Sequence, residues 1–170
     1  MSNDEQVAAV LLAAGRSRRM GAFKALLPFG RRSVVETCVA NLSEAGASEV
    51  VVVVGHRGDE VRAALAGVAR VRFAVNEVEG SEMGLSVARG VEAVSGGAKA
   101  VLVALVDHPA VPPGAIESLL EARARTGARL VVPEWRGRGG HPVLVDLSLR
   151  GELLSVVRER GLRALFDAHG

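Results

Sequence analysis

Short, continuous apolar runs, separated by longer amphipathic stretches, constrain the fold of this chain more than any other feature of its sequence. The runs cover residues 7–12, 50–54, 71–75, 100–106 and 130–132, and they contain almost no polar side chain. A strand with one face in water alternates apolar and polar residues, so these runs predict strands that are buried on both faces. Such strands form a mostly parallel sheet that helices cover.

The stretches between the runs carry the signals that begin and end helices. Ser33 and Glu36 have the spacing of a capping box, and Gly46 marks the end of the helix that follows. Three further helices are predicted, over residues 58–67, 84–94 and 112–126. A flexible basic loop over residues 136–142, a short strand over residues 143–145 and two helical turns complete the chain. This alternation indicates one domain over residues 1–170, folded as a three-layer α/β/α sandwich with a mostly parallel sheet.

The composition excludes several classes of function. Five large aromatic side chains and no Tyr leave too few rings for a platform that stacks single-stranded nucleic acid. The single cysteine, Cys38, excludes a disulfide framework and a Cys-based zinc site. No apolar stretch reaches the roughly 18 residues that a membrane span needs, and the polar first residues do not resemble a signal peptide. We therefore expect a cytoplasmic protein that binds neither nucleic acid nor a membrane.

The segment after the first run has the features of a phosphate-binding loop. Ligands of parallel sheets bind at the carboxyl ends of the strands, and the small residues 13–15 let a ligand approach the main chain. Four cations follow within a short distance: Arg16, Arg18, Arg19 and Lys24. The glycine spacing fits neither a Walker A loop nor a dinucleotide fingerprint. Ser17 lacks the second glycine of a hydrolase elbow, so it is a poor candidate for a nucleophile.

Polar residues follow other strand ends as well. Asp107 comes directly after the run at residues 100–106, where its carboxylate is placed to hold Mg²⁺ on a phosphate, or else lies in a solvated turn. The glycine-rich segment over residues 76–86 presents donors to a ligand or serves as ordinary helix capping. His141, in the basic loop, contacts an acceptor substrate or has no functional role.

Together these residues resemble a known family. Leu12-Ala13-Ala14-Gly15, Ser17, Arg19-Met20-Gly21 and Lys24 are similar to the signature of the MobA-like NTP transferases. Within that family, the segment over residues 76–86, Gly140-His141-Pro142 and residues 161–165 most resemble molybdenum cofactor cytidylyltransferase. The resemblance implies a Rossmann-like fold of the nucleotide-diphospho-sugar transferase type. It also implies Mg²⁺-dependent transfer of CMP from CTP to the phosphate of molybdopterin, with release of pyrophosphate.

The resemblance also implies a role for each matching residue. Lys24, Arg19 and Asp107 are the implied catalytic residues, and Asp107 is the implied metal ligand. His141 is implied to lie toward the acceptor, molybdopterin. The implied nucleotide-binding residues are Leu12, Ala13, Ala14, Gly15, Ser17, Arg19, Lys24, Asn76, Gly80 and Ser86. Specificity for CTP rests on Ser86 and on the methyl group of Ala14, which disfavours a larger purine.

The sequence departs from the family pattern in two places. His108 stands between Asp107 and Pro109, where the family has Gln. The family's C-terminal strand, which carries a second metal-binding Asp, is not found within residues 1–170. The sequence leaves open whether Asp146 or Asp167 replaces that carboxylate. Two alternatives therefore stay open. One is guanylyl or other nucleotidyl transfer to another phosphorylated acceptor, and the other is a non-catalytic accessory protein that binds nucleotide or cofactor. A molybdoenzyme or a chaperone is a further expected partner.

Overall fold

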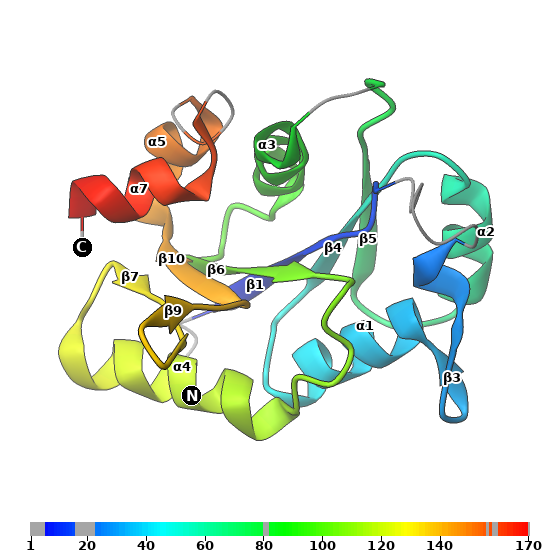
Figure 1. The fold of residues 1–170 in the computed structure, drawn as a ribbon, viewed down its shortest axis with the longest axis horizontal. Helices are drawn as coiled ribbons and strands as arrows, with labels where there is room; N and C mark the ends of the chain where they lie inside the picture. The colour runs from blue at the N-terminus through cyan, green and yellow to red at the C-terminus, as the bar shows by residue number, and fades with distance from the viewer. Residues whose placement is uncertain (1–5, 16–22, 80–81, 156, 158–159, 170) are drawn as a thin grey trace.

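A six-stranded, mostly parallel sheet forms the centre of the computed structural model, which describes residues 6–15, 23–79, 82–155, 157 and 160–169. The strand order is β5-β4-β1-β6-β10-β7 (Figure 1). The strands are β1 (Val7–Leu12), β4 (Val50–Val54), β5 (Val71–Val75), β6 (Ala100–Leu105), β7 (Leu130–Val131) and β10 (Val143–Asp146). β10 runs antiparallel to both of its neighbours, β6 and β7, and the other five strands share one direction. The predicted fold class is confirmed.

Helices cover both faces of this sheet. One face packs against α1 (Val34–Glu44), α2 (Gly58–Ala64) and α4 (Pro113–Thr126). The other packs against α3 (Met83–Ala93), α5 (Arg150–Leu154) and α7 (Leu162–His169), which lie together above the sheet in Figure 1. Alternate residues of β1 point into the two cores, and all six are buried. Two-sided burial therefore explains the runs that form the central strands β1, β4 and β6. The same prediction is wrong for the edge strands, because only Ala74 is buried in β5 and neither residue of β7 is. No helix among the described residues is long and apolar enough to cross a membrane.

The predicted helix signals act as expected at most ends. Ser33 accepts a hydrogen bond from the Glu36 main chain at 3.4 Å, and the Glu36 carboxylate accepts one from the Ser33 main chain at 2.7 Å. This capping box begins α1. Gly127, with φ of +67°, ends α4 in the left-handed conformation that favours glycine. The second helix, α2, is shorter than predicted, because it ends at Ala64 and continues as turns toward Gly67.

The prediction of a flexible basic loop over residues 136–142 is wrong. Residues 134–139 form a hairpin of β8 (Glu134–Trp135) and β9 (Arg138–Gly139). Its turn consists of Arg136 and Gly137, whose φ angles of 49° and 74° are both positive. Two such residues join antiparallel strands with the twist that a tight hairpin needs. A second short hairpin pairs β2 (Pro28–Phe29) with β3 (Arg32–Ser33), after the 3₁₀ helix η1 (Lys24–Leu26).

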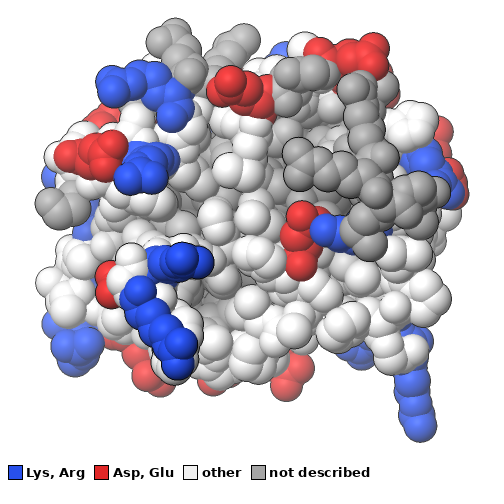
Figure 2. Space-filling model, viewed as in Figure 1, with Lys and Arg blue, Asp and Glu red and all other residues white. Residues whose placement is uncertain are grey.

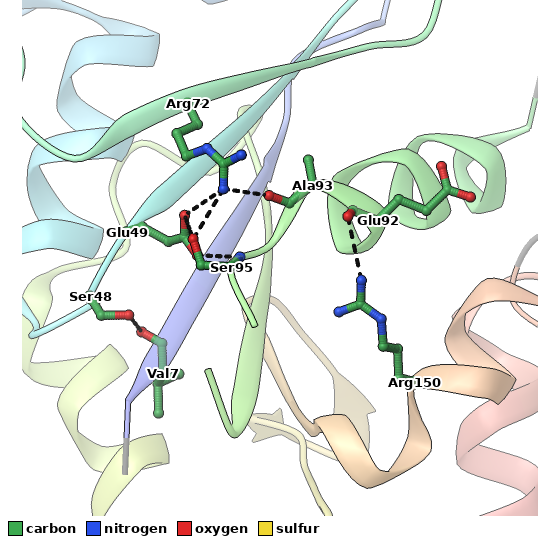
Figure 3. Close-up of polar contacts among 8 residues, drawn as sticks. All are labelled: Val7, Ser48, Glu49, Arg72, Glu92, Ala93, Ser95 and Arg150. Carbon is green, nitrogen blue, oxygen red and sulfur yellow. Dashed lines mark hydrogen bonds and ion pairs between the residues drawn. The ribbon is translucent and has the colours of Figure 1, made fainter. Parts of the chain in front are cut away.

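A buried carboxylate ties the elements together at the amino-terminal edge of the parallel strands (Figure 3). Glu49 is only 8% exposed, and it accepts hydrogen bonds from the main chain and hydroxyl of Ser95 at 2.7 and 3.0 Å. Arg72 lies 3.3 Å from the same carboxylate and also donates to the Ala93 carbonyl at 2.8 Å. Because its charge is paired and hydrogen-bonded, Glu49 links β4, β5 and the end of α3 without an unpaired buried ion.

Candidate functional site

The loops that follow β1, β4 and β5 meet at Gly55. A Cβ atom at this position would lie 2.7 Å from the Asn76 carbonyl oxygen and 3.1 Å from the Ala14 carbonyl oxygen. The Asn76 main chain also donates to the Val54 carbonyl at 2.8 Å. Only glycine permits three main chains to approach this closely. The carboxyl edge of the sheet therefore presents closely spaced main chain rather than bulky side chains.

The segment after β1 emerges from the core at this edge. Leu12 and Ala13 are buried, Ala14 is half-buried and Gly15 is exposed. The Leu12 carbonyl accepts a hydrogen bond from Val106 at 3.2 Å, which brings the loop after β6 beside it. Three further members of the predicted nucleotide-binding set, Ser17, Arg19 and Gly80, lie outside the described residues.

Lys24 and Asp107 meet at the same edge. Lys24 begins η1, Asp107 follows β6, and the Lys24 Nζ and Asp107 Oδ1 atoms are 3.1 Å apart. The two side chains are 30% and 54% exposed, so a ligand reaches both. An ion pair this exposed contributes little to stability. The structure thus brings together two of the three predicted catalytic residues, where a cation and a carboxylate can act on a substrate phosphate.

Asp107 suits a metal ion that arrives with a nucleotide. The described residues contain no cluster of three or more His, Cys, Asp or Glu side chains that would hold an ion alone. Mg²⁺ keeps several water ligands and is commonly bound by one or two carboxylates together with substrate phosphates. A single accessible carboxylate fits that donor set. It does not fit a metal ion that is bound by protein ligands only.

Asp146 and Asp167 do not complete this site. Asp146 pairs with Ala100 at the start of β6, whereas Asp107 follows the end of that six-residue strand, a separation on the order of 20 Å. α7, which carries Asp167, ends at the same remote edge. There His169 lies 3.4 Å from the guanidinium of Arg129, whose carbonyl accepts from the Asp146 main chain. The sequence left open whether either residue replaces a second metal carboxylate, and in this structure neither lies beside Asp107.

Asn76 and Ser86 do come together, but as a pair that holds a loop. The Asn76 amide nitrogen donates to the Ser86 hydroxyl at 2.8 Å, and each residue is 7% exposed. The Asn76 side-chain oxygen accepts from the Val78 main chain at 3.3 Å. These contacts tie the loop after β5 to α3. The pair therefore fixes the position of that loop relative to α3.

His141 lines a pocket beside Asp107. The ring centroids of His141 and His108 are 6.1 Å apart, and the two rings meet edge to face. The His141 Nε2 atom is buried without a hydrogen-bond partner within the described residues. Burial, and then the proximity of His108, lower the pKa of His141, so the imidazole is neutral at pH 7. Cys38 and Asn41 line the same pocket, whose cavity of about 20 Å³ has room for a water molecule. His141 therefore offers a neutral polar atom at this edge.

Arg57 was not predicted from the sequence to take part in this site. It adopts the left-handed conformation with φ of 61°, and its guanidinium lies 2.5 Å from the Glu60 carboxylate and 5.1 Å from the centre of the Phe23 ring. Phe23 precedes Lys24, so Arg57 holds the end of the predicted phosphate-binding loop. The i,i+3 spacing of Arg57 and Glu60 could have indicated their ion pair. The contact between Arg57 and Phe23 could not be predicted, because the two residues are far apart in the sequence.

Comparison with known proteins places these features in a family. A family model described as the MobA-like NTP transferase domain matches residues 9–170. A probable molybdenum cofactor guanylyltransferase of Mycobacterium avium is 31% identical over 174 residues, which cover 99% of this chain and 84% of that protein. Nicotine blue oxidoreductase of Paenarthrobacter nicotinovorans is 36% identical over 157 residues, covering 89% and 76%.

One further relative is matched over only part of its own length, and solved structures match the fold of this chain. The bifunctional protein GlmU of Geobacter metallireducens is 35% identical over 128 residues, so this chain matches 74% of itself but spans only 27% of that relative's length. A crystal structure of Rv0371c from Mycobacterium tuberculosis H37Rv superposes with a TM-score of 0.84 at 26% identity, covering 96% of this chain and 83% of that one. A second structure of Rv0371c is a complex with manganese, with a TM-score of 0.79 at 25% identity and the same coverage.

Proposed function

This chain is a nucleotidyltransferase that belongs to the MobA-like NTP transferase family, and we propose that it transfers CMP from CTP to the terminal phosphate of molybdopterin. The observation that supports this most directly is the Lys24–Asp107 pair at 3.1 Å. It joins the loop after β1, which resembles a phosphate-binding loop, to a carboxylate at the end of β6.

In the proposed reaction, a phosphate oxygen of the acceptor attacks the α-phosphorus of CTP, and the bond to the departing pyrophosphate breaks. The main chain at residues 13–15 holds the nucleotide, and Lys24 with Arg19 neutralises the charge of the leaving group. Asp107 holds Mg²⁺, which offsets negative charge on the reacting phosphates when it is bound. His141 donates or accepts a hydrogen bond on the acceptor side. Positioning and charge neutralisation supply most of the rate in such transfers.

GTP is the competing donor, because one relative is named a guanylyltransferase. The methyl group of Ala14 supports CTP, since Ala14 lies in the half-buried main chain where a base would approach. One methyl group changes selectivity by only about 1–3 kcal/mol. Ser86 acts through the loop that Asn76 fixes. We therefore expect a preference for CTP rather than absolute exclusion of GTP.

Calorimetric titration of CTP, GTP and ATP tests this proposal, with Mg²⁺, with Mn²⁺ and without metal. We expect metal-dependent binding, tightest for CTP, that Asp107→Ala abolishes. Pyrophosphate release in the presence of molybdopterin then measures turnover. Equal turnover of CTP and GTP would overturn the CTP preference and leave nucleotidyl transfer in place. If no nucleotide binds under any condition, the donor site is wrong and the accessory-protein alternative replaces it.

A further inference from the structure

The β8–β9 hairpin places the chain's only tryptophan in solvent. Trp135 is 75% exposed, more than any other large apolar side chain of the described residues. It pairs directly across the hairpin with Arg138, so the two side chains share one face. The guanidinium of Arg136 lies 5.5 Å from the centre of the Trp135 ring. An indole flanked by two cations is therefore displayed at the surface.

Packing does not explain this arrangement. All four residues of β8 and β9 are exposed, and neither hydrophobic core includes Trp135. Arg136 adopts the positive φ that the first residue of the two-residue turn between β8 and β9 requires. The hairpin thus holds an exposed ring in a defined orientation.

The hairpin projects from the edge of the sheet that carries the candidate site. β7 pairs antiparallel with β10, and β10 pairs antiparallel with β6, so β7 and β6 end at the same edge. The hairpin follows β7 and leads through Gly140 into His141, whose ring is 6.1 Å from that of His108. Figure 2 shows basic side chains over this hairpin, beside a largely uncharged surface. A ligand that contacts the hairpin therefore extends toward Asp107.

We propose that the β8–β9 hairpin binds the planar ring system of the acceptor. The ring stacks on the Trp135 indole, and Arg138 donates to electron-rich oxygens at the ring edge, while the acceptor phosphate extends past His141 to the Lys24–Asp107 pair. This rests on the proposed function, because it assigns the acceptor end of that same site. A hairpin of two two-residue strands is small for a protein partner, since a stable interface buries about 800 Å² on each side. It is sufficient for one fused ring.

Fluorescence tests this directly, because Trp135 is the only tryptophan and the chain has no tyrosine. The full chain is titrated with a pterin monophosphate, with the same pterin lacking phosphate, and with CTP. We expect saturable quenching by both pterins and none by CTP. The control is the double variant Trp135→Phe/Phe29→Trp, which moves the indole to the β2–β3 hairpin, on the other side of the molecule in Figure 1. Its signal should show only the non-saturating absorbance of the pterin.

Calorimetry of variants separates stacking from charge. We expect Trp135→Ala to weaken pterin binding roughly tenfold, the effect of losing one aromatic stack. Arg138→Ala should weaken both pterins alike by several-fold, because the phosphate lies at the other end. Arg31→Ala, an exposed arginine in the β2–β3 turn, should change nothing.

Pyrophosphate release measured in parallel separates the two proposals. If Trp135→Ala leaves pterin affinity and the acceptor KM unchanged while turnover continues, the hairpin assignment is overturned and the transferase proposal stands. If pterins quench Trp135 saturably but no pyrophosphate is released with any nucleotide, the hairpin assignment stands and the proposed reaction fails. Binding of an acidic protein without any effect of pterins would also overturn the hairpin assignment.

Discussion

Lys24 is the cation among the described residues best placed to act on a substrate phosphate, because its Nζ already lies 3.1 Å from Asp107. We expect Lys24→Ala to lower kcat by roughly two to three orders of magnitude, the usual cost of a lost electrostatic stabiliser. Stability should change by less than about 1 kcal/mol, because the ion pair is exposed. Steady-state pyrophosphate release and urea unfolding measure the two effects.

The chain offers a matched control for this substitution. Lys99 is the only other lysine in the sequence, and it lies exposed just before β6, at the opposite edge of the sheet. Lys99→Ala should leave kcat unchanged. A Lys24→Ala protein that turns over at the normal rate would remove Lys24 from the mechanism.

The Cys38 thiol lies close to the site but should be unreactive. Burial, and then the charge of Asp107, raise its pKa from 9.0 to about 11. We expect a disulfide reagent at pH 8 to label Cys38 only as fast as the protein unfolds, because the thiolate is the reactive form. The folded pKa exceeds the unfolded value, so the associated stability is complete below pH 9 and is lost as pH rises toward 11. Labelling of the folded protein at the rate of a urea-unfolded sample would contradict this environment.

Single residues differ in how well the sequence revealed them. The position of Asp107 was predictable, because it directly follows a buried run and so lies at the carboxyl end of a parallel strand, where ligands of such sheets bind. The contacts of Arg57 with Phe23 and of His108 with His141 were not. Each joins loops that are distant in sequence, and only the strand order brings them together. The orientation of Asn76 toward Ser86 was likewise a tertiary result.

Among the secondary-structure elements, burial on both faces made the central strands predictable. β1 and β4 begin and end where their apolar runs do, since every residue in them is buried. The β8–β9 hairpin was missed because its strands are short, exposed and without an apolar pattern. The sequence signal for this hairpin was Gly137, which lies in the two-residue turn. A glycine within a basic segment is also typical of an irregular loop, so the hairpin was not recognised.

The close approach of α3 to the sheet yields a prediction at the scale of one helix. A Cβ added to Gly90 would lie 2.3 Å from one Val10 methyl carbon and 2.9 Å from a Val53 methyl carbon. Valine side chains are stiff and these two are fully buried, so α3 must move. We expect Gly90→Ala to lower the free energy of unfolding by about 1–3 kcal/mol, as overpacking of a core typically does. Urea unfolding followed by circular dichroism measures it.

Gly114, in the first turn of α4, is the control for this substitution. Nothing lies within 4 Å of a Cβ added there. Gly114→Ala should be neutral or stabilise the protein by up to about 1 kcal/mol, because alanine is the better helix former. If Gly90→Ala proved equally harmless, the close contact of α3 with Val10 would be wrong.

Across the whole molecule, the two edges of the sheet serve different purposes. The carboxyl edge holds an exposed, weakly stabilising pair, Lys24 and Asp107. The opposite edge holds more enclosed charges that join elements. There Asp146 accepts from Arg123 at 2.6 Å and from the Ser148 main chain at 2.9 Å. The sequence shows carboxylates at both edges, but it does not show which of them are already paired.

The same Asp→Asn substitution can be made at both edges of the sheet, at Asp146 and at Asp107, and the two effects can be compared. Burial alone would raise the pKa of Asp146, but the hydrogen bonds from Arg123 and Ser148 outweigh it and hold that pKa below its usual value. Asp146→Asn should therefore lower the free energy of unfolding by about 1–3 kcal/mol at pH 7, the value of a hydrogen bond to a charged group. Because the folded pKa is depressed, this loss should shrink as pH falls through it.

Asp107→Asn should lower turnover rather than stability. We expect turnover to fall by at least roughly a hundredfold, as for loss of a charged group that acts on the reacting phosphates, with stability within about 1 kcal/mol of the unchanged protein. Asp146→Asn should keep kcat within about twofold, since ~20 Å separates Asp146 from Asp107. Urea unfolding at pH 7 and pH 4, together with pyrophosphate release, distinguishes the two variants. A folded Asp146→Asn protein that lost turnover would give Asp146 a part in the reaction, and it would require the two edges to come together.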